Sequence, residues 1–342
     1  EEIVVTAQKR AQNSQDVGIA ISAVTGDDLA SLGAMSASDI TRTMPAGVLT
    51  QPNGPSSFSL SIRGVTQNDF NDVVEAPNAV YLDEGYIASS QAQSFALFDI
   101  DRVEVLRGPQ GTLFGSGSLS GAVRYVTAKP DLATSLARVE VTGATTERGA
   151  GSYNGSLVLN TPIVDGTLAL RSVAYYYNDG GFINDPRSHR NNINSTETEG
   201  ARLALRYRPN ARFTADLTVM AQESVDNASA SSLDPTPNGG SHFVTDGIYE
   251  PAYRASNRIF SMNLAYEFDH ASLVSNSTYH RRTGRSDGDE YYFVPLITFL
   301  ASGFTSFIDG AGQSTFAVFG DYLDRKSTRL NSSHVALSRM PS

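Results

Sequence analysis

Residues 102–130 read RVEVLRGPQGTLFGSGSLSGAVRYVTAKP and join two short β-rich runs through a glycine-rich connection. The runs cover 102–106 and 122–127, and turn-forming residues end each of them. Arg107 is followed by a rigid turn, and the later glycines allow positive φ or close approach of backbone. The residues of this motif are Gly108, Pro109, Gln110, Gly111, Gly115 and Gly121. The stretch predicts two strands of a small sheet.

The rest of the first 130 residues predicts a small α+β domain around these strands. Further β-rich runs lie at 59–63 and 79–82. At 25–28 and again at 36–39 a hydroxyl residue is followed three positions later by an aspartate, which is a typical helix start. We therefore expect two short helices. The composition changes at 128–130, where we place the domain boundary.

The segment 131–325 shows a different pattern, in which apolar and polar residues alternate. Along 201–208, one face carries Ala201, Leu203, Leu205 and Tyr207. The alternation recurs at 213–222 and 260–268, and less perfectly near 136–147, 152–162, 167–178 and 271–284. These are about seven strands of roughly 9 to 13 residues, long enough to cross a bilayer at a tilt.

The joins between these strands favour a membrane barrel over a soluble sandwich. The short join 208–211 alternates with the long join 223–257, and outer-membrane barrels combine short turns on one side with long loops on the other. A soluble antiparallel sandwich also alternates, although its strands are usually shorter. The alternation alone does not say which face lies inside, so the sandwich stays an alternative at this point.

Composition excludes several classes of protein. The 342 residues carry 26 Lys and Arg against 36 Asp and Glu, a net charge of −10, with no basic stripe of the kind that nucleic-acid binding requires. There is no cysteine, and the five histidines have no ligand spacing, so we expect no metal site and no cofactor. No phosphate-binding loop or nucleophile motif occurs, which predicts a protein that is not an enzyme. No apolar run approaches about 18 residues, which excludes a helical membrane protein.

The stretch 102–130 closely resembles the end of the plug domain of TonB-dependent outer-membrane receptors. The sequences IRGV at 62–65, VYLD at 80–83 and EIVVTAQKR at 2–10 support the resemblance, and 175–183, 200–206 and 275–279 resemble early barrel strands of the same receptors. The resemblance covers about residues 1–325. It implies an α+β plug domain at 11–130, followed at 131–325 by antiparallel transmembrane β-barrel strands. Family barrels close with about 22 strands, so the barrel is incomplete in this chain.

The resemblance implies that residues 1–10 contain a TonB box. The box residues are Ile3, Val4, Val5, Thr6 and Ala7. Their β-branched composition suits a segment that adds a strand to the sheet edge of TonB, the partner that belongs to an inner-membrane energising complex. An ordinary buried first strand is the alternative interpretation.

The resemblance also implies that the plug residues Arg63 and Arg107 pair with carboxylates of the barrel wall and so hold the plug in place. The alternative is that each arginine is satisfied within the plug. Ligand contacts are expected from three polar loops at 51–57, 66–75 and 86–93, although solvated turns would have the same composition. The candidates are Gln51, Asn53, Gln67, Asn68, Asp69 and Tyr86.

These features together predict a fragment of a receptor for energy-coupled uptake of a scarce ligand across the Gram-negative outer membrane. The ligand classes are a siderophore complex, a vitamin or an oligosaccharide, and the expected partners are TonB and outer-membrane lipid. The alternative is a plug-based binding or signalling protein without transport. Residues 326–342 have no acid and no strand alternation, and they resemble translated sequencing-adapter DNA. We expect this tail to have no function, the alternative being a genuine basic tail.

Overall fold

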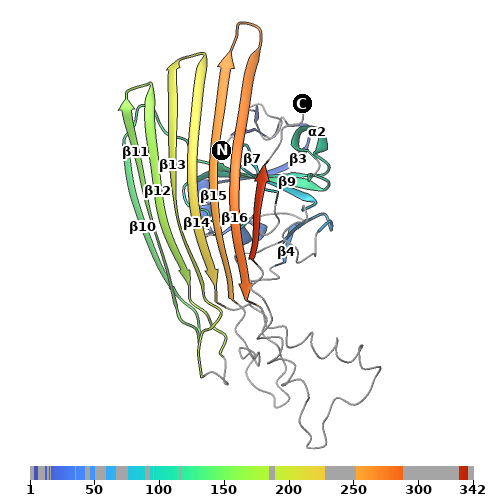
Figure 1. Cartoon of the computed structure of the whole chain (residues 1–342), viewed down its shortest axis with the longest axis vertical. Helices are drawn as coiled ribbons and strands as arrows, with labels where there is room; N and C mark the ends of the chain where they lie inside the picture. The colour runs from blue at the N-terminus through green and yellow to red at the C-terminus, as the bar shows by residue number, and fades with distance from the viewer. Residues whose placement is uncertain are drawn as a thin grey trace, which may run out of the picture.

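The computed structural model describes residues 4–6, 12–13, 15, 17–34, 36–42, 47–50, 59–66, 76–88, 93–94, 96–115, 117–184, 189–227, 252–287 and 331–337. They form a small mixed domain that lies against one face of a tall antiparallel sheet (Figure 1). We call the small domain the plug and the tall sheet the wall. Within these residues, no helix has the length and apolar character needed to cross a membrane.

The stretch 102–130 forms the centre of the plug. Its two β-rich runs become β8 (Ile100–Arg107) and β9 (Gly121–Thr127), which pair antiparallel. The five-stranded sheet has the order β3-β8-β9-β6-β7, and the β6–β9 pair is parallel. Its other strands are β3 (Ala20–Thr25), β6 (Asn78–Leu82) and β7 (Gly85–Tyr86). The two strands expected from this stretch are therefore confirmed.

Both predicted helix starts are confirmed. The Thr25 side chain accepts a hydrogen bond from the Asp28 N–H at 3.1 Å and begins α1 (Gly26–Ser31). At the second start the bond runs the other way, because the Asp39 side chain accepts from the Ser36 N–H at 3.1 Å, and this helix is the 3-10 element η1 (Ala37–Arg42). The remaining elements are α2 (Gly111–Phe114) and the pairs β1 (Val4–Val5) with β2 (Gln12–Asn13) and β4 (Gly47–Thr50) with β5 (Ser59–Ile62).

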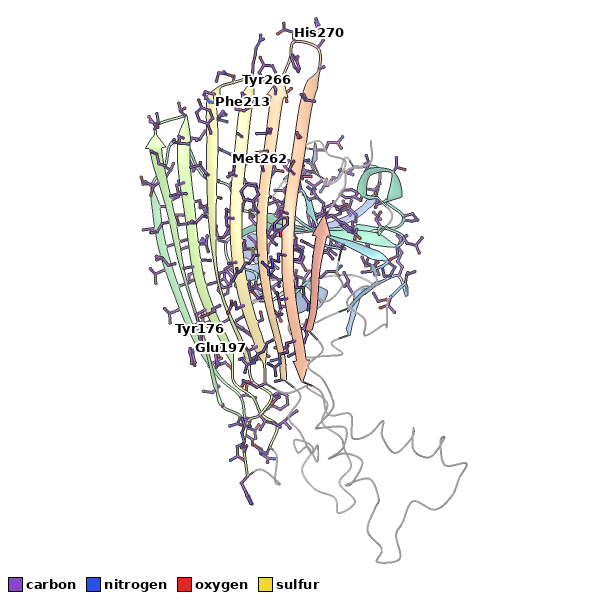
Figure 2. The ribbon with its side chains drawn as sticks, viewed as in Figure 1. Tyr176, Glu197, Phe213, Met262, Tyr266 and His270 are labelled. Carbon is purple, nitrogen blue, oxygen red and sulfur yellow. The ribbon has the colours of Figure 1, made fainter. Side chains whose placement is uncertain are left out.

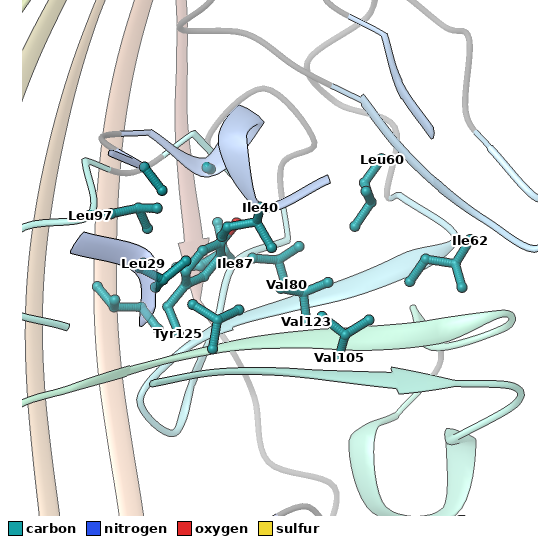
Figure 3. Close-up of a cluster of buried hydrophobic side chains, with 14 of the residues drawn as sticks. Leu29, Ile40, Leu60, Ile62, Val80, Ile87, Leu97, Val105, Val123 and Tyr125 are labelled. Carbon is teal, nitrogen blue, oxygen red and sulfur yellow. The ribbon is translucent and has the colours of Figure 1, made fainter. Parts of the chain in front are cut away.

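The plug sheet is buried on both faces because its strands alternate between two apolar clusters. Val103 and Val105 of β8 face the first cluster, which Figure 3 shows around Val80, Val123 and Tyr125. This cluster also takes in Met220 and Ile259 from the wall. Leu106 faces the second cluster, whose buried members are Val5, Val17, Ala79, Tyr81, Leu106, Phe114 and Ala122.

The wall consists of consecutive antiparallel strands, each paired with the next along the chain. They are β10 (Leu136–Thr145), β11 (Gly151–Val164), β12 (Leu168–Asp179), β13 (Thr196–Asn210), β14 (Phe213–Asp226), β15 (Ala252–Glu267) and β16 (Ser272–Asp287), followed by β17 (Asn331–Leu337). In the described part of the wall, β10 and β17 each have a neighbour on one side only. The seven predicted strands are confirmed, within a sheet that is not closed.

β17 lies inside 326–342, where we expected no strand, and its pairing with β16 does not test whether that segment is native.

The burial pattern of the wall decides between barrel and sandwich. On β13, Arg202 and Ala204 are buried against the plug, whereas Leu203 between them is 51 % exposed. The same inversion places Gln222 and Asn257 inside and leaves Val219 and Phe260 exposed. A soluble sandwich would bury the apolar face, so the polar-inside arrangement is that of a barrel strand.

We predict that Gly121→Ala destabilises the plug by about 1–3 kcal/mol, because a Cβ there would overlap the Leu106 carbonyl oxygen and approach Ile62. Gly111→Ala is the matched control, since its Cβ would meet nothing within 4 Å. The measurement is pulse proteolysis of the plug in the full-length receptor. Equal resistance of the two variants would contradict the prediction.

Candidate functional site

The second apolar cluster of the plug holds part of the predicted TonB box. Val5 pairs with Gln12 in the β1–β2 ladder and is completely buried, while Val4 is about half exposed. Thr6 follows directly. The predicted box residues Ile3 and Ala7 lie outside the described residues. The segment is therefore docked as a short buried strand, and its role as a box stays a prediction.

Thr6 is fixed by a buried charge network, which we call the box network. Its N–H donates to Glu104 at 2.9 Å, and its hydroxyl oxygen accepts from Arg124 at 2.8 Å and from Arg102 at 3.1 Å. Arg124 and Arg102 each also bind the Glu104 carboxylate, at 2.7 and 2.8 Å. Glu104 and Arg124 are buried, so these charges depend on one another and on Thr6 for their hydrogen bonds.

Arg124 extends the box network across the sheet to the wall. Its second terminal nitrogen binds Glu84 at 2.7 Å, at the turn between β6 and β7. Gly85, the first residue of β7, approaches β16 so closely that a Cβ would lie 2.8 Å from the Thr278 side chain. One chain of contacts thus runs from Thr6 through two central strands to the wall.

A second charged cluster, the wall clamp, attaches the plug to the wall through Asp99. The carboxylate binds Arg171 of β12 through two bonds of 2.8 and 2.5 Å, and Arg202 of β13 at 2.5 Å. Arg202 also donates to the Asp99 carbonyl oxygen at 2.9 Å, and Arg138 of β10 lies 3.4 Å from the carboxylate. Asp99 has a positive φ of 55°, which points its side chain into the arginines. No specific sign of this cluster is present in the sequence, because arginines on strands of alternating polarity suit a lumen or solvent equally well.

Neutral contacts next to Asp99 strengthen the attachment. Phe98 stacks on Tyr175 of β12 with ring centroids 4.8 Å apart. The Gln222 side chain of β14 accepts from the Ala96 N–H at 3.2 Å and donates to the Ser94 carbonyl oxygen at 3.2 Å. The connection that precedes β8 is therefore bound to several wall strands.

The two predicted latch arginines lie together at another edge of the plug. Arg63 is exposed in the turn after β5, and its guanidinium lies against Gly108, which follows Arg107. The Nε of Arg107 is buried and has no hydrogen-bond partner in the part of the chain that the structure describes. Neither arginine pairs there with a carboxylate of β10–β17. Their role as a latch stays a prediction.

The plug motif forms a tight connection between β8 and β9. Gly108 and Gly115 have positive φ values of 107° and 77°, and Gly64 in the Arg63 turn has 80°. Gln110 precedes α2, which begins at Gly111, and Pro109 lies in the turn. Backbone bonds from Gly108 to Ser120 and from Gln110 to Ser118, at 2.7 and 3.0 Å, close the connection.

One of the six predicted ligand-contact residues lies within the described residues. Tyr86 is half-buried in β7, and its ring packs on Tyr81, with centroids 5.4 Å apart, against the second apolar cluster, which also contains Val5. The structure therefore places Tyr86 against the same apolar cluster as Val5 of the box segment, and a ligand contact of Tyr86 stays a prediction. The other five candidates lie outside the described residues, and they are Gln51, Asn53, Gln67, Asn68 and Asp69.

A polar pocket of about 420 Å³ opens between the plug and the wall beside the box network. Its lining includes Arg102, Lys129 and Asp131 from the plug side and Arg206 and Arg208 near the short turn after β13. The box network thus lies toward the short-turn end of the wall. Among the described residues, no group of three acidic or histidine side chains is placed to hold a metal ion.

Comparison with known proteins agrees with this geometry. The family model "TonB-dependent Receptor Plug Domain" matches residues 13–122. Residues 13–122 are a TonB-dependent receptor plug domain, and strands of barrel type follow them. The pesticin receptor of Yersinia pestis is 32 % identical over 216 residues, which are 60 % of this chain and 30 % of that receptor.

Two solved receptors share the fold. The ferric yersiniabactin uptake receptor FyuA from Yersinia pestis aligns with a TM-score of 0.69 at 22 % identity, over 78 % of this chain and 41 % of that one. The ferripyoverdine receptor of the outer membrane of Pseudomonas aeruginosa aligns with a TM-score of 0.65 at 18 % identity, over 84 % and 38 %. The chain spans less than half the length of each of these relatives. The matches are to receptors rather than enzymes, and they confirm the outer-membrane location expected from the sequence.

We predict that Asp99→Asn weakens the attachment of the plug by about 3–5 kcal/mol, because Arg171 and Arg202 would stay buried without a counter-charge. Asp101→Asn is the control, since the Asp101 side chain is 52 % exposed. The urea concentration that exposes the plug of the full-length receptor to protease measures the effect. A midpoint as high in Asp99→Asn as in Asp101→Asn would show that the wall clamp does not hold the plug.

A pH dependence is expected from Asp83, which is buried beside Lys129 at 2.8 Å and accepts from the Thr127 N–H at 2.9 Å. Burial alone would raise the pKa of Asp83, but Lys129 and Thr127 lower the pKa below its ordinary value of 3.8. The stabilisation is then present above pH 3.8 and is lost as the pH falls through the lowered pKa.

Asp83→Asn should therefore reduce stability at neutral pH and flatten the loss on acidification. Thermal unfolding of the full-length receptor at pH 7 and at pH 3, followed by near-UV circular dichroism, measures both effects. Identical acid sensitivity of the two proteins would contradict this assignment.

Proposed function

We propose that this chain is the plug and the first wall strands of a receptor that takes a scarce ligand across the outer membrane with energy delivered through TonB. The observation that most directly supports this proposal is the box network. Thr6, inside the predicted TonB box, is bound directly to the buried Glu104–Arg124 pair at the centre of the plug.

This geometry supports a mechanical function for the segment. A pull on Val4 and Val5 would peel a two-residue strand from its ladder and withdraw the bonding partners that Thr6 gives to Glu104 and Arg124. Buried charges that lose partners are strongly destabilised, so water must enter or the strands must shift. Removal of the box would thus loosen β8 and β9.

The wall clamp supports the second half of this proposal. Asp99 precedes β8 directly, and Arg171 and Arg202 hold it on the wall. The plug therefore has a fixed attachment at one end of β8, while the box is bound in the middle of the same strand. Force on Thr6 would rearrange the plug around its attachment and open a path along the wall.

We propose a ligand from the classes expected from the sequence, namely a siderophore complex, a vitamin or an oligosaccharide. The names of FyuA and of the ferripyoverdine receptor refer to ferric ligands, which supports the first class. Partners would be TonB and its inner-membrane complex, the ligand and outer-membrane lipid.

We predict that Val5→Pro in the full-length receptor lowers uptake at least about tenfold, because proline has no N–H for pairing with a partner strand. Val5→Ile keeps the β-branched side chain and the N–H, and it should retain uptake. The measurement is accumulation of a radiolabelled panel of ferric siderophores and cobalamin in cells that express equal amounts of receptor.

Ligand binding to intact cells is measured in parallel. Binding without uptake in Val5→Pro supports energy coupling through this segment. Undiminished uptake in Val5→Pro contradicts it, and a wild-type receptor that binds a ligand without any uptake would favour the binding or signalling alternative.

A further inference from the structure

The outward face of the wall carries an apolar belt with a sharp boundary. Figure 2 shows Phe213, Met262 and Tyr266 at the upper part of the wall, close to the short turns. On β14 the outward residues run from Phe213 through Leu217 and Val219 to Ala221. These eight steps span about 26 Å at about 3.3 Å per residue, which is close to the apolar band of about 25 Å in outer-membrane barrels.

Arginines gather immediately beyond this belt. Arg254 and Arg258 lie on β15, and Arg281 and Arg285 lie on β16, on the same outward face as Phe260. The register pairs Arg258 directly with Arg281, and Arg254 directly with Arg285. Like charges directly opposite one another on a sheet are destabilising, so an anion beside the Arg258–Arg281 pair would stabilise it.

The protein supplies little negative charge to these arginines within the described residues. No carboxylate lies within ion-pair distance of Arg254, Arg258 or Arg281 there, and all three are exposed. Glu223 on β14 is diagonal to Arg254 and Arg258 in the register, beyond that distance. Arg285 has a further contact of its own.

The arginines lie at the long-loop end of the wall. β14 and β15 are separated by 227–251, and β16 is followed by 288–330, whereas the turns at the opposite end are as short as 211–212 and 268–271. In outer-membrane barrels the long loops are extracellular. The cluster therefore faces the headgroup layer of the outer leaflet.

We propose that Arg254, Arg258 and Arg281 bind the phosphate groups of a phosphorylated lipid in the outer leaflet. Guanidinium groups form bidentate bonds with phosphate, and their apolar stems can lie along the belt while the heads stay in the polar layer. A doubly phosphorylated headgroup can neutralise the Arg258–Arg281 pair and Arg254 together. The inference rests on the outer-membrane placement in the proposed function and adds the lipid chemistry that the wall selects.

The test measures lipid binding to the full-length receptor in a neutral detergent by native mass spectrometry. The probes are diphosphorylated lipid A, its dephosphorylated form and inorganic phosphate. We expect the wild type to bind the diphosphorylated lipid, and the double variant Arg258→Gln/Arg281→Gln to bind it at least about tenfold more weakly, because charge-assisted bonds are lost from both residues. Arg212→Gln is the matched control, since this exposed arginine pairs with Asp269 at the short-turn end.

Equal binding by the double variant and the wild type would overturn the proposal, as would equal binding of the dephosphorylated lipid. Displacement of the lipid by inorganic phosphate at a similar concentration would show that the site takes a free anion, which also overturns the assignment to lipid. Arg254→Gln alone, which leaves the Arg258–Arg281 pair intact, should give an intermediate loss. Ligand uptake is recorded separately, so a failure of lipid binding is distinguished from a failure of transport.

Discussion

The docking of the plug depends on one buried carboxylate. Asp99 lies where the chain enters β8, and its backbone adopts a left-handed conformation that brings the side chain between Arg171 and Arg202. Three charges removed from water are stable only while their hydrogen bonds are complete. The position of the plug on the wall is thereby restricted to the one in which Asp99 meets these arginines, and the apolar contacts of Phe98 with Tyr175 follow from it.

One strand connects this attachment to the box segment. β8 begins just after Asp99, carries Glu104 in its middle and is paired on both sides, with β3 and β9. A strand held by two ladders changes as a unit, so displacement of Thr6 from Glu104 is felt along the whole sheet. The structure separates the functions by location, because the wall clamp resists movement while the box network is the part that a partner could disrupt.

Much of this architecture could be predicted from local sequence, and the charged contacts could not. The 102–130 motif predicted β8 and β9 because turn chemistry and short apolar runs are local signals. The start of β13 was missed, since residues 196–199 are polar on both faces. Arg63 and Arg107 were expected as the plug's ionic contacts, whereas the described contact uses a plug aspartate and wall arginines. Whether the plug or the wall carries the negative charge depends on how the two pack together, and the residue periodicity of a single strand does not show this.

The wall strands also extend beyond the stretch in which apolar and polar residues alternate. β13, β14 and β15 continue past the belt by several residues, so their outward side chains at that end meet headgroups and water rather than hydrocarbon. Alternation stops there, although backbone pairing continues. Outward charges then cost little desolvation, and their signs are free to match what lies beside them. Outward charged residues such as Arg258 and Glu199 therefore indicate what surrounds this end of the wall. The apolar belt indicates only the thickness of the hydrocarbon layer.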